Sequence, residues 1–268
     1  MGIVGHILGL LTDFPYFYGK NAIISPYFMA YTLDNVADAL EIEAVDTVLS
    51  KEKLVNEFAR ITQFVTWPIL TIIFRLLFKV KINGQEVFHN LRGPFVIIAN
   101  HTSFYDSFLF RLVLGIFTPH LPLRFMAVTK FEGKWMNHMA SLGIVDFIYS
   151  LFGVFTVVPG LGIEKNIAKA KHIIAIGGNI VIYPEGRIIK DEKIGPFKNG
   201  AAVLFKQTNV PIIPVTFRRI NERKLRKTIV INVGNILDIS QNRSVEDITQ
   251  IFYKVILTQY KKGNISTI

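Results

Sequence analysis

Residues 94–115 read PFVIIANHTSFYDSFLFRLVLG. The first part, 94–100, is a short run rich in β-branched residues, which is typical of a buried strand. From 104 to 115 apolar residues recur at helical spacing, and a few polar residues separate the two patterns. A strand, a polar turn and a helix in this order are typical of an α/β domain whose sheet is buried on both faces.

The same alternation continues toward the C-terminus. Short β-rich runs predict further strands at 123–130, 152–158, 179–185, 211–217 and 228–234. Helical patterns predict helices at 139–151, 163–176, 198–207 and 244–262. We therefore predict that residues 81–268 form one α/β domain with a mixed, largely parallel sheet flanked by helices.

Residues 1–80 form a separate N-terminal region in this prediction. A helix is predicted at 33–60, and the apolar run 61–80 is about as long as a minimal membrane span. Three polar or helix-breaking residues interrupt this run: Gln63, Pro68 and Arg75. We therefore predict a helical, membrane-associating segment that lies in the interface or enters one leaflet, with a buried core helix as the alternative.

The composition limits the class of partner. Hydrophobic residues make up 50% of the chain, charged residues 19%, and the net charge is +10. Such a chain fits an anionic membrane or a phosphorylated substrate better than nucleic acid, for which no binding motif appears. The absence of cysteine excludes disulfides and thiolate chemistry and agrees with the cytoplasmic face of a membrane. The histidines lack metal-ligand spacing, so we expect no metal.

Polar residues follow the strand 94–100 at the edge where α/β proteins place their sites. His101 suits general base catalysis, because histidine is the side chain whose unperturbed pKa lies closest to neutrality. If Asp106 lies in the first turn of the following helix, its carboxylate can orient the imidazole. The alternative is structural, because Ser103 and Asp106 have the spacing of a capping box.

The stretch Asn100-His101-Thr-Ser-Phe-Tyr-Asp106 resembles the His-x4-Asp motif of the glycerolipid acyltransferases, which include 1-acylglycerol-3-phosphate (lysophosphatidate) acyltransferase. Later segments resemble the other blocks of that family, in the same order. These segments are Tyr183-Pro184-Glu185-Gly186-Arg187, Gly195-Pro-Phe-Lys198-Asn-Gly200-Ala-Ala and Val210-Pro-Ile-Ile-Pro214-Val. Lys130 matches a lysine often found between the first two blocks.

The resemblance implies transfer of an acyl chain to a glycerolipid hydroxyl, such as that of lysophosphatidate or a lysophospholipid. The donor would be a thioester of coenzyme A or acyl carrier protein, in phospholipid biosynthesis or remodelling, without a further cofactor. The catalytic pair would be His101 and Asp106. The implied substrate-binding residues are Asn100, Glu185, Gly186, Arg187, Lys130 and Lys198.

One departure from the family pattern bears on the acceptor. Pro159 stands where the second block usually has an arginine that is thought to hold the acceptor's phosphate, although Arg187 can serve in its place. Two alternatives stay open: a catalytically inactive, lipid-binding relative and a transacylase that does not use coenzyme A. The acyl length, the donor carrier and the oligomeric state do not follow from the sequence.

The densest cluster of positive charge lies at residues 218–227. It predicts contact with anionic headgroups or with an acidic carrier protein. A solvated hairpin is the alternative.

Overall fold

The structure is a computed structural model that describes residues 26–115, 118–128, 138, 144–158, 160–190, 193–220 and 226–262. Its contacts divide the chain into two compact units, with the boundary between Val48 and Leu49. The described residues of the first unit, from Pro26 onward, are helical. The second unit contains the sheet and the strand–turn–helix segment around His101.

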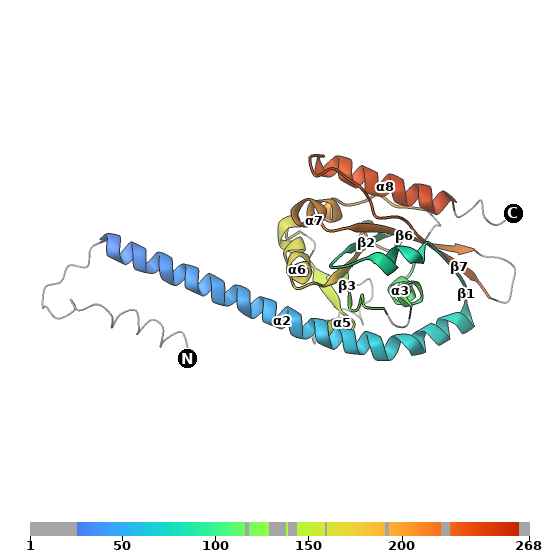
Figure 1. The fold of residues 1–268 in the computed structure, drawn as a ribbon, viewed down its shortest axis with the longest axis horizontal. Helices are drawn as coiled ribbons and strands as arrows, with labels where there is room; N and C mark the ends of the chain where they lie inside the picture. Colours follow the sequence, from blue (N-terminus) through green and yellow to red (C-terminus); the bar gives the residue numbers. More distant parts are fainter. Residues whose placement is uncertain are drawn as a thin grey trace, which may run out of the picture. The chain divides into compact units, whose positions relative to one another are not determined.

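A seven-stranded sheet forms the centre of the second unit, in the order β1-β7-β6-β2-β5-β3-β4 (Figure 1). Neighbouring strands pair in parallel except β6 and β7, which are antiparallel. The mixed, largely parallel sheet predicted from the sequence is therefore confirmed. The strands are β1 (Lys79–Asn83), β2 (Val96–Ala99), β3 (Leu123–Val128), β4 (Val154–Val157), β5 (Asn179–Ile182), β6 (Ile212–Ile220) and β7 (Thr228–Val233).

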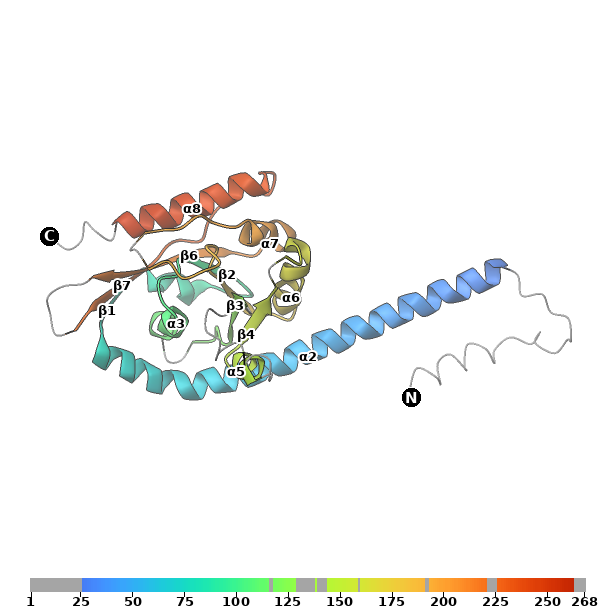
Figure 2. The ribbon, with the colours of Figure 1, turned by 180° about the vertical axis from the view of Figure 1, so that it is seen from behind.

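Helices cover both faces of this sheet, so the domain has three layers (Figure 1, Figure 2). One face packs against α6 (Ile163–Ala175), α7 (Gly200–Thr208) and α8 (Val245–Lys262). The other packs against α3 (Asp106–Leu114), the 3-10 helix η1 (Gln85–Asn90) and the C-terminal part of α2 (Pro26–Leu77). Of the helix predicted at 139–151, α5 (Ile144–Leu151) is observed, and residues 139–143 lie outside the described residues.

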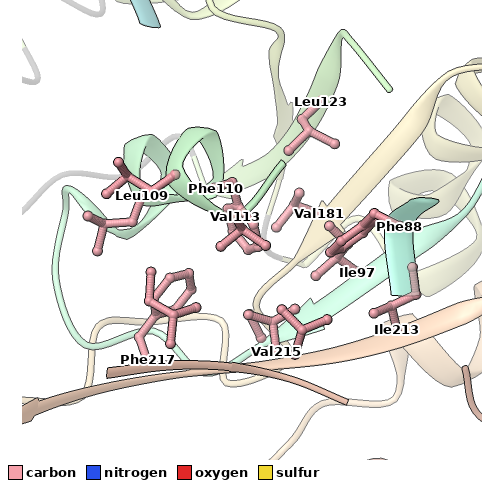
Figure 3. Close-up of a cluster of buried hydrophobic side chains, with 14 of the residues drawn as sticks. Phe88, Ile97, Leu109, Phe110, Val113, Leu123, Val181, Ile213, Val215 and Phe217 are labelled. Atoms are coloured by element: carbon pink, nitrogen blue, oxygen red, sulfur yellow. The ribbon is translucent and has the colours of Figure 1, made fainter. Parts of the chain in front are cut away.

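Strand β2 lies in the middle of the sheet, and all four of its residues are buried. Successive side chains of a strand alternate between faces, so Val96 and Ile98 join the core under α6–α8, whereas Ile97 joins the core under α3. Figure 3 shows Ile97 among side chains from α3 and β6: Leu109, Phe110, Val113, Ile213, Val215 and Phe217. Burial on both faces explains why the sequence of β2 is continuously apolar.

The C-terminal part of α2 packs along one side of the α/β domain. Gln63 interrupts the apolar run in the sequence, and in the structure it is fully buried. Its amide nitrogen donates to the carbonyls of Leu123 (2.7 Å) and Phe152 (2.9 Å), and its amide oxygen accepts from the Leu123 N–H (3.0 Å). The polar residue that interrupts the apolar run therefore links α2 to the start of β3.

A buried ion pair attaches an earlier turn of α2 to the same strand. Arg124 of β3 donates to Glu52 (3.0 Å) and to the side-chain oxygen of Asn56 (2.6 Å). Burial lowers the pKa of Arg124, and the charge of Glu52 opposes that shift. These contacts hold this part of α2 in the compact unit that begins at Leu49. The domain boundary predicted after residue 80 stays a prediction.

Strand β1 begins two residues after α2 ends and was not predicted, because the N-terminal helical region was expected to extend to residue 80. Its residues alternate between exposed and half-buried, with Lys79, Lys81 and Asn83 exposed. It pairs in parallel with β7 at the edge of the sheet, where Lys79 lies opposite Thr228. Lysines on an edge strand protect it from pairing with other chains, but they also hide the apolar pattern of a strand.

We expect Gln63→Leu to lower the free energy of unfolding by about 3 kcal/mol, because the buried carbonyl and N–H of Leu123 and the partly buried carbonyl of Phe152 lose their hydrogen bonds to Gln63. Urea denaturation followed by circular dichroism measures the change. Phe64→Leu, on the exposed side of the same helical turn, is the matched control and should change stability little. Equal stability of the Gln63→Leu variant and the wild type would contradict this account of α2.

Candidate functional site

His101 and Asp106, the pair predicted to be catalytic, lie next to each other at the carboxyl end of β2. His101 follows the strand after one residue, and Asp106 is the first residue of α3. The Nδ1 atom of His101 lies 3.1 Å from Oδ2 of Asp106. The pair forms because the turn between strand and helix brings the two side chains together, which a five-residue offset on one continuous helix would not do.

Asp106 is completely buried and its carboxylate is surrounded by donors. Its Oδ2 atom accepts hydrogen bonds from the backbone N–H groups of Thr102 and Ser103, both at 2.7 Å. The bond from the Ser103 N–H has the spacing of a capping box, but the predicted box is not formed, because α3 begins at Asp106 with Tyr105 as its N-cap and no side-chain cap bond. The hydrogen bonds that hold the Asp106 carboxylate also place it beside His101, and the catalytic role of the pair stays a prediction.

Tyr183 supplies the surface on which the imidazole rests. The two rings stack with centroids 4.0 Å apart and planes at 16°. The Tyr183 hydroxyl lies 3.0 Å from that of Ser107, on the first turn of α3. Burial raises the pKa of Tyr183 well above its ordinary value, and the charge of Asp106 raises it further. Tyr183 therefore stays neutral, and with its ring stacked on one face of the imidazole it restricts the rotation of His101.

Glu185 joins two loops through its buried carboxylate. One oxygen accepts from the His101 N–H at 2.7 Å, and the other accepts from the Gly195 N–H at 2.8 Å. Burial raises the pKa of Glu185, and the two backbone hydrogen bonds oppose that shift. Its observed contacts are therefore with backbone, and no ion pair with Arg187 forms among the described residues. Substrate binding by Glu185 stays a prediction.

Asn100 is also fully buried. Its amide nitrogen donates to the Phe217 carbonyl (2.9 Å), and its amide oxygen accepts from the Phe217 N–H (2.8 Å). This two-way pairing extends the contact of β2 with β6 by one residue beyond the strand. In the structure Asn100 therefore sets where the chain leaves the sheet toward His101, and the substrate contact predicted for it stays a prediction.

The loop after β5 presents two exposed cations, Arg187 and Lys198. Gly186 has a positive φ of 65°, and a Cβ there would lie 2.7 Å from the Lys198 ammonium nitrogen. The lysine side chain therefore lies against the Gly186 backbone, which requires glycine. Neither cation takes part in the ion pairs found in the described ranges.

Two residues with predicted relevance to substrate binding, Lys130 and Pro159, lie outside the described residues. The roles predicted for Lys130 and Pro159 stay predictions. Within the described part of the chain, no group of three or more His, Asp or Glu side chains could hold a metal ion.

Arg219 reaches the site although we predicted only a surface role for its segment. Its Nη2 atom lies 2.5 Å from Oδ1 of Asp106, and its Nε donates to the hydroxyl of Tyr105 at 3.0 Å. The sequence contains a signal for this position of Arg219. Ile213, Val215 and Phe217 face α3, and period-2 alternation along β6 places Arg219 on the same face.

An apolar surface lies on the same side of the sheet as the site. The stretch Ser50–Leu77 of α2 is long and apolar enough to cross a membrane by length and composition. One side of it packs on the domain, and the other side is exposed. The exposed apolar residues of α2 are Leu54, Phe58, Ile61, Phe64, Val65, Ile69, Ile72, Ile73, Leu76 and Leu77. Phe104, in the turn between His101 and Asp106, is 67% exposed and extends the set.

Comparisons with known proteins identify the family of the chain. A model of the acyltransferase family matches residues 79–218. A chloroplast 1-acyl-sn-glycerol-3-phosphate acyltransferase of Brassica napus is 27% identical over 144 residues, which are 52% of this chain and 37% of that protein. A Caenorhabditis elegans protein named for the same activity is 26% identical over 214 residues, which are 76% of this chain and 73% of that protein. The chain thus spans little more than a third of the first relative and most of the second.

A solved structure has a similar fold. It is the 1-acyl-sn-glycerophosphate (LPA) acyltransferase PlsC from Thermotoga maritima, with a TM-score of 0.51 and 18% identity over 83% of this chain and 82% of that one. At this identity the likeness shows the fold alone. The family model, however, matches more than half of the chain and covers β2, the turn with His101, and the loop after β5. The chain therefore belongs to the acyltransferase family.

Proposed function

We propose that the protein transfers an acyl chain from a thioester to a hydroxyl of a glycerolipid, with His101 as general base and Asp106 as its partner. The observation that carries the proposal is the 3.1 Å contact between Nδ1 of His101 and Asp106. It orients one ring nitrogen and leaves Nε2, which has no hydrogen-bond partner among the described residues, to take a proton. The names of the relatives support the glycerolipid acceptor.

In the proposed reaction the acceptor hydroxyl attacks the thioester carbonyl while its proton passes to Nε2 of His101. A C–O bond forms, and the tetrahedral intermediate then collapses as the C–S bond breaks. His101 returns the proton to the departing thiolate, so the products are an ester and a free thiol. Asp106 stabilises the imidazolium that exists between the two proton transfers.

The tetrahedral intermediate carries negative charge on oxygen and needs a donor or a cation nearby. The N–H groups of Thr102 and Ser103, at the turn before α3, already donate to Asp106. We therefore propose that Lys198, whose ammonium lies beside the Gly186 backbone, stabilises this negative charge. Arg187 has the planar fork that suits a phosphate, so we assign it to the acceptor's phosphate when the acceptor has one.

We also propose that the exposed side of α2 binds the surface of a membrane and brings lipid acceptors to the site. Because the opposite side of the same helix is bound to β3 through Gln63 and Glu52, this part of α2 lies along the domain and suits an interfacial position. Arg75, Lys79 and Lys81 are exposed near its C-terminal end, where they can contact anionic headgroups.

We expect the double variant Ile69→Glu/Ile72→Glu to lose at least about tenfold in affinity for vesicles with anionic lipid, because each exposed isoleucine contributes roughly 1.5 kcal/mol when buried. Vesicle sedimentation measures the change. Asn242→Glu/Gln250→Glu adds the same charge at exposed positions in and beside α8 and is the control. Equal loss in both variants would show that charge alone, and not this face, governs binding.

The function is tested with detergent-extracted protein, a labelled acyl donor and a panel of acceptors. The donors are acyl-CoA, acyl carrier protein thioester and a phospholipid without thioester, and the acceptors are lysophosphatidate and several lysophospholipids. Ester formation that needs a thioester supports the proposal, and the preferred acceptor shows whether a phosphate monoester is required. Transfer from phospholipid alone would indicate a transacylase. Vesicle binding without any product would indicate an inactive lipid-binding relative.

A further inference from the structure

Arg219 lies at the end of β6, beside the catalytic turn and far from it in the chain. Its neighbour Arg218 lies on the opposite face of the strand, with its guanidinium 5.8 Å from the ring of Tyr260 on α8. The two arginines therefore have different surroundings although they are adjacent in the sequence. One packs under a helix on the far side of the sheet, and the other faces the start of α3.

All three guanidinium nitrogens of Arg219 contact the turn that contains the catalytic pair. The Nε atom donates to the Tyr105 hydroxyl at 3.0 Å, and Nη1 donates to the hydroxyl of Thr102. Nη2 donates to Oδ1 of Asp106 at 2.5 Å. The guanidinium also lies 4.7 Å from the Tyr105 ring centroid. One side chain thus contacts the turn on both sides of Ser103 and Phe104.

The side chain of Arg219 is 17% exposed, so solvent screens its charge only in part. Burial lowers the pKa of Arg219, but the charge of Asp106 and the bonds to Asp106 and Tyr105 raise it more, and the net shift is upward. Arg219 is therefore a permanent positive charge in direct contact with the carboxylate that orients His101.

The negative charge of Asp106 has two opposing effects on His101 as a general base. It orients the imidazole, but an unbalanced carboxylate also favours the imidazolium, and a base that already holds a proton cannot accept the one from the acceptor hydroxyl. We propose that Arg219 is a positioning residue: it holds the 101–106 turn in place and balances Asp106, so that Asp106 orients His101 without keeping it protonated. This inference rests on the function proposed above.

The other groups described near the imidazole do not supply the positive charge that Arg219 provides. Tyr183 stacks on the ring and is neutral, and Tyr105 and Ser107 carry no charge. Glu185 is bonded to the His101 N–H and adds a second acidic group close by. Among the described residues in contact with the 101–106 turn, Arg219 is the cation that pairs with Asp106.

The test compares Arg219→Gln and Arg219→Met, which remove the charge, with Arg219→Lys, which keeps the charge but loses the planar fork. In the neutral variants we expect the acidic limb of the kcat profile to move to higher pH, because an opposing positive charge is lost. In Arg219→Lys the limb should stay in place while kcat falls by about 10²-fold through misplacement of the turn, and KM should change little. Arg218→Gln is the control on the same strand and should leave the limb in place.

A readout without substrate separates this inference from the proposed function. The ¹³C-labelled ring of His101, assigned with His101→Asn, reports its protonation directly by NMR. We expect its midpoint to move to higher pH in the neutral variants than in the wild type, even if no acceptor is found. An unchanged midpoint in the neutral variants, or wild-type kcat in Arg219→Lys, overturns the role of Arg219. If neither neutral variant folds, the role of Arg219 is tested with Arg219→Lys alone, by its kcat and by the position of the acidic limb of its kcat profile. A shifted midpoint in a protein that forms no product would instead contradict the proposed function alone.

Discussion

His101→Ala is expected to reduce acyl transfer by about 10³-fold or more, because it removes the general base from the reaction. KM for the acceptor should change little, since His101 acts on a proton rather than holding the lipid. Initial rates with saturating thioester and the acceptor chosen from the panel measure the effect.

The fold should survive this change. Asp106 keeps its bonds to the Thr102 and Ser103 N–H groups and to Arg219, so its carboxylate remains satisfied. The stacking with Tyr183 is lost, which costs about 1 kcal/mol. The control is His89→Ala, at an exposed position of η1, which should keep both rate and stability. A near-normal rate in a folded His101→Ala protein would reject the mechanism.

Asp106→Asn is expected to have the second large effect, on activity and on stability together. The carboxylate accepts donors on both oxygens, so an amide must turn its NH₂ group against donors on one side. Arg219 also loses its counter-charge in a mostly buried place, and we expect the free energy of unfolding to fall by about 3 kcal/mol. The rate should fall by roughly 10³- to 10⁴-fold, because the orientation of His101 is lost.

A double-mutant cycle separates these two effects. Asp106→Asn combined with Arg219→Gln removes the unpaired charge, so part of the lost stability should return. The rate should not return, since nothing then orients the imidazole. Thermal unfolding and initial rates on the four proteins give both coupling energies. Recovery of activity in the double variant would show that Asp106 serves only to balance Arg219.

The strand–turn–helix segment could be predicted from the sequence because its information is local. Period and length identify a buried strand at 94–100 and a helix at 104–115, and the structure contains β2 and α3 there. His101 and Asp106 are close in the chain, so their meeting follows from the turn between two correctly predicted elements. Strand β1 was missed because its lysines at the sheet edge obscure the alternation on which such a prediction depends.

The contacts of Gln63, Glu185 and Arg219 could not be predicted in the same way. Gln63 was interpreted as a polar interruption, and its partners are the backbone of Leu123 and Phe152, about 60 to 90 residues away. Glu185 bonds to the backbone of His101, and backbone groups are the same in every sequence. Arg219 lies in a basic cluster, and composition does not separate it from Arg218, which faces the other side of the sheet.

The sequence by itself determined the class of the fold, the family and the pair His101 and Asp106, because periodicity and short motifs are properties of neighbouring residues. The tertiary structure decided which buried polar groups surround that pair. Pairing of β2 with β5 and β6 brings Tyr183, Glu185 and Arg219 to the turn, and strand pairing over long separations leaves no local signal. The proximity of His101 and Asp106 thus follows from one segment of the sequence, and the environment of this proposed catalytic pair arises from the order of the strands.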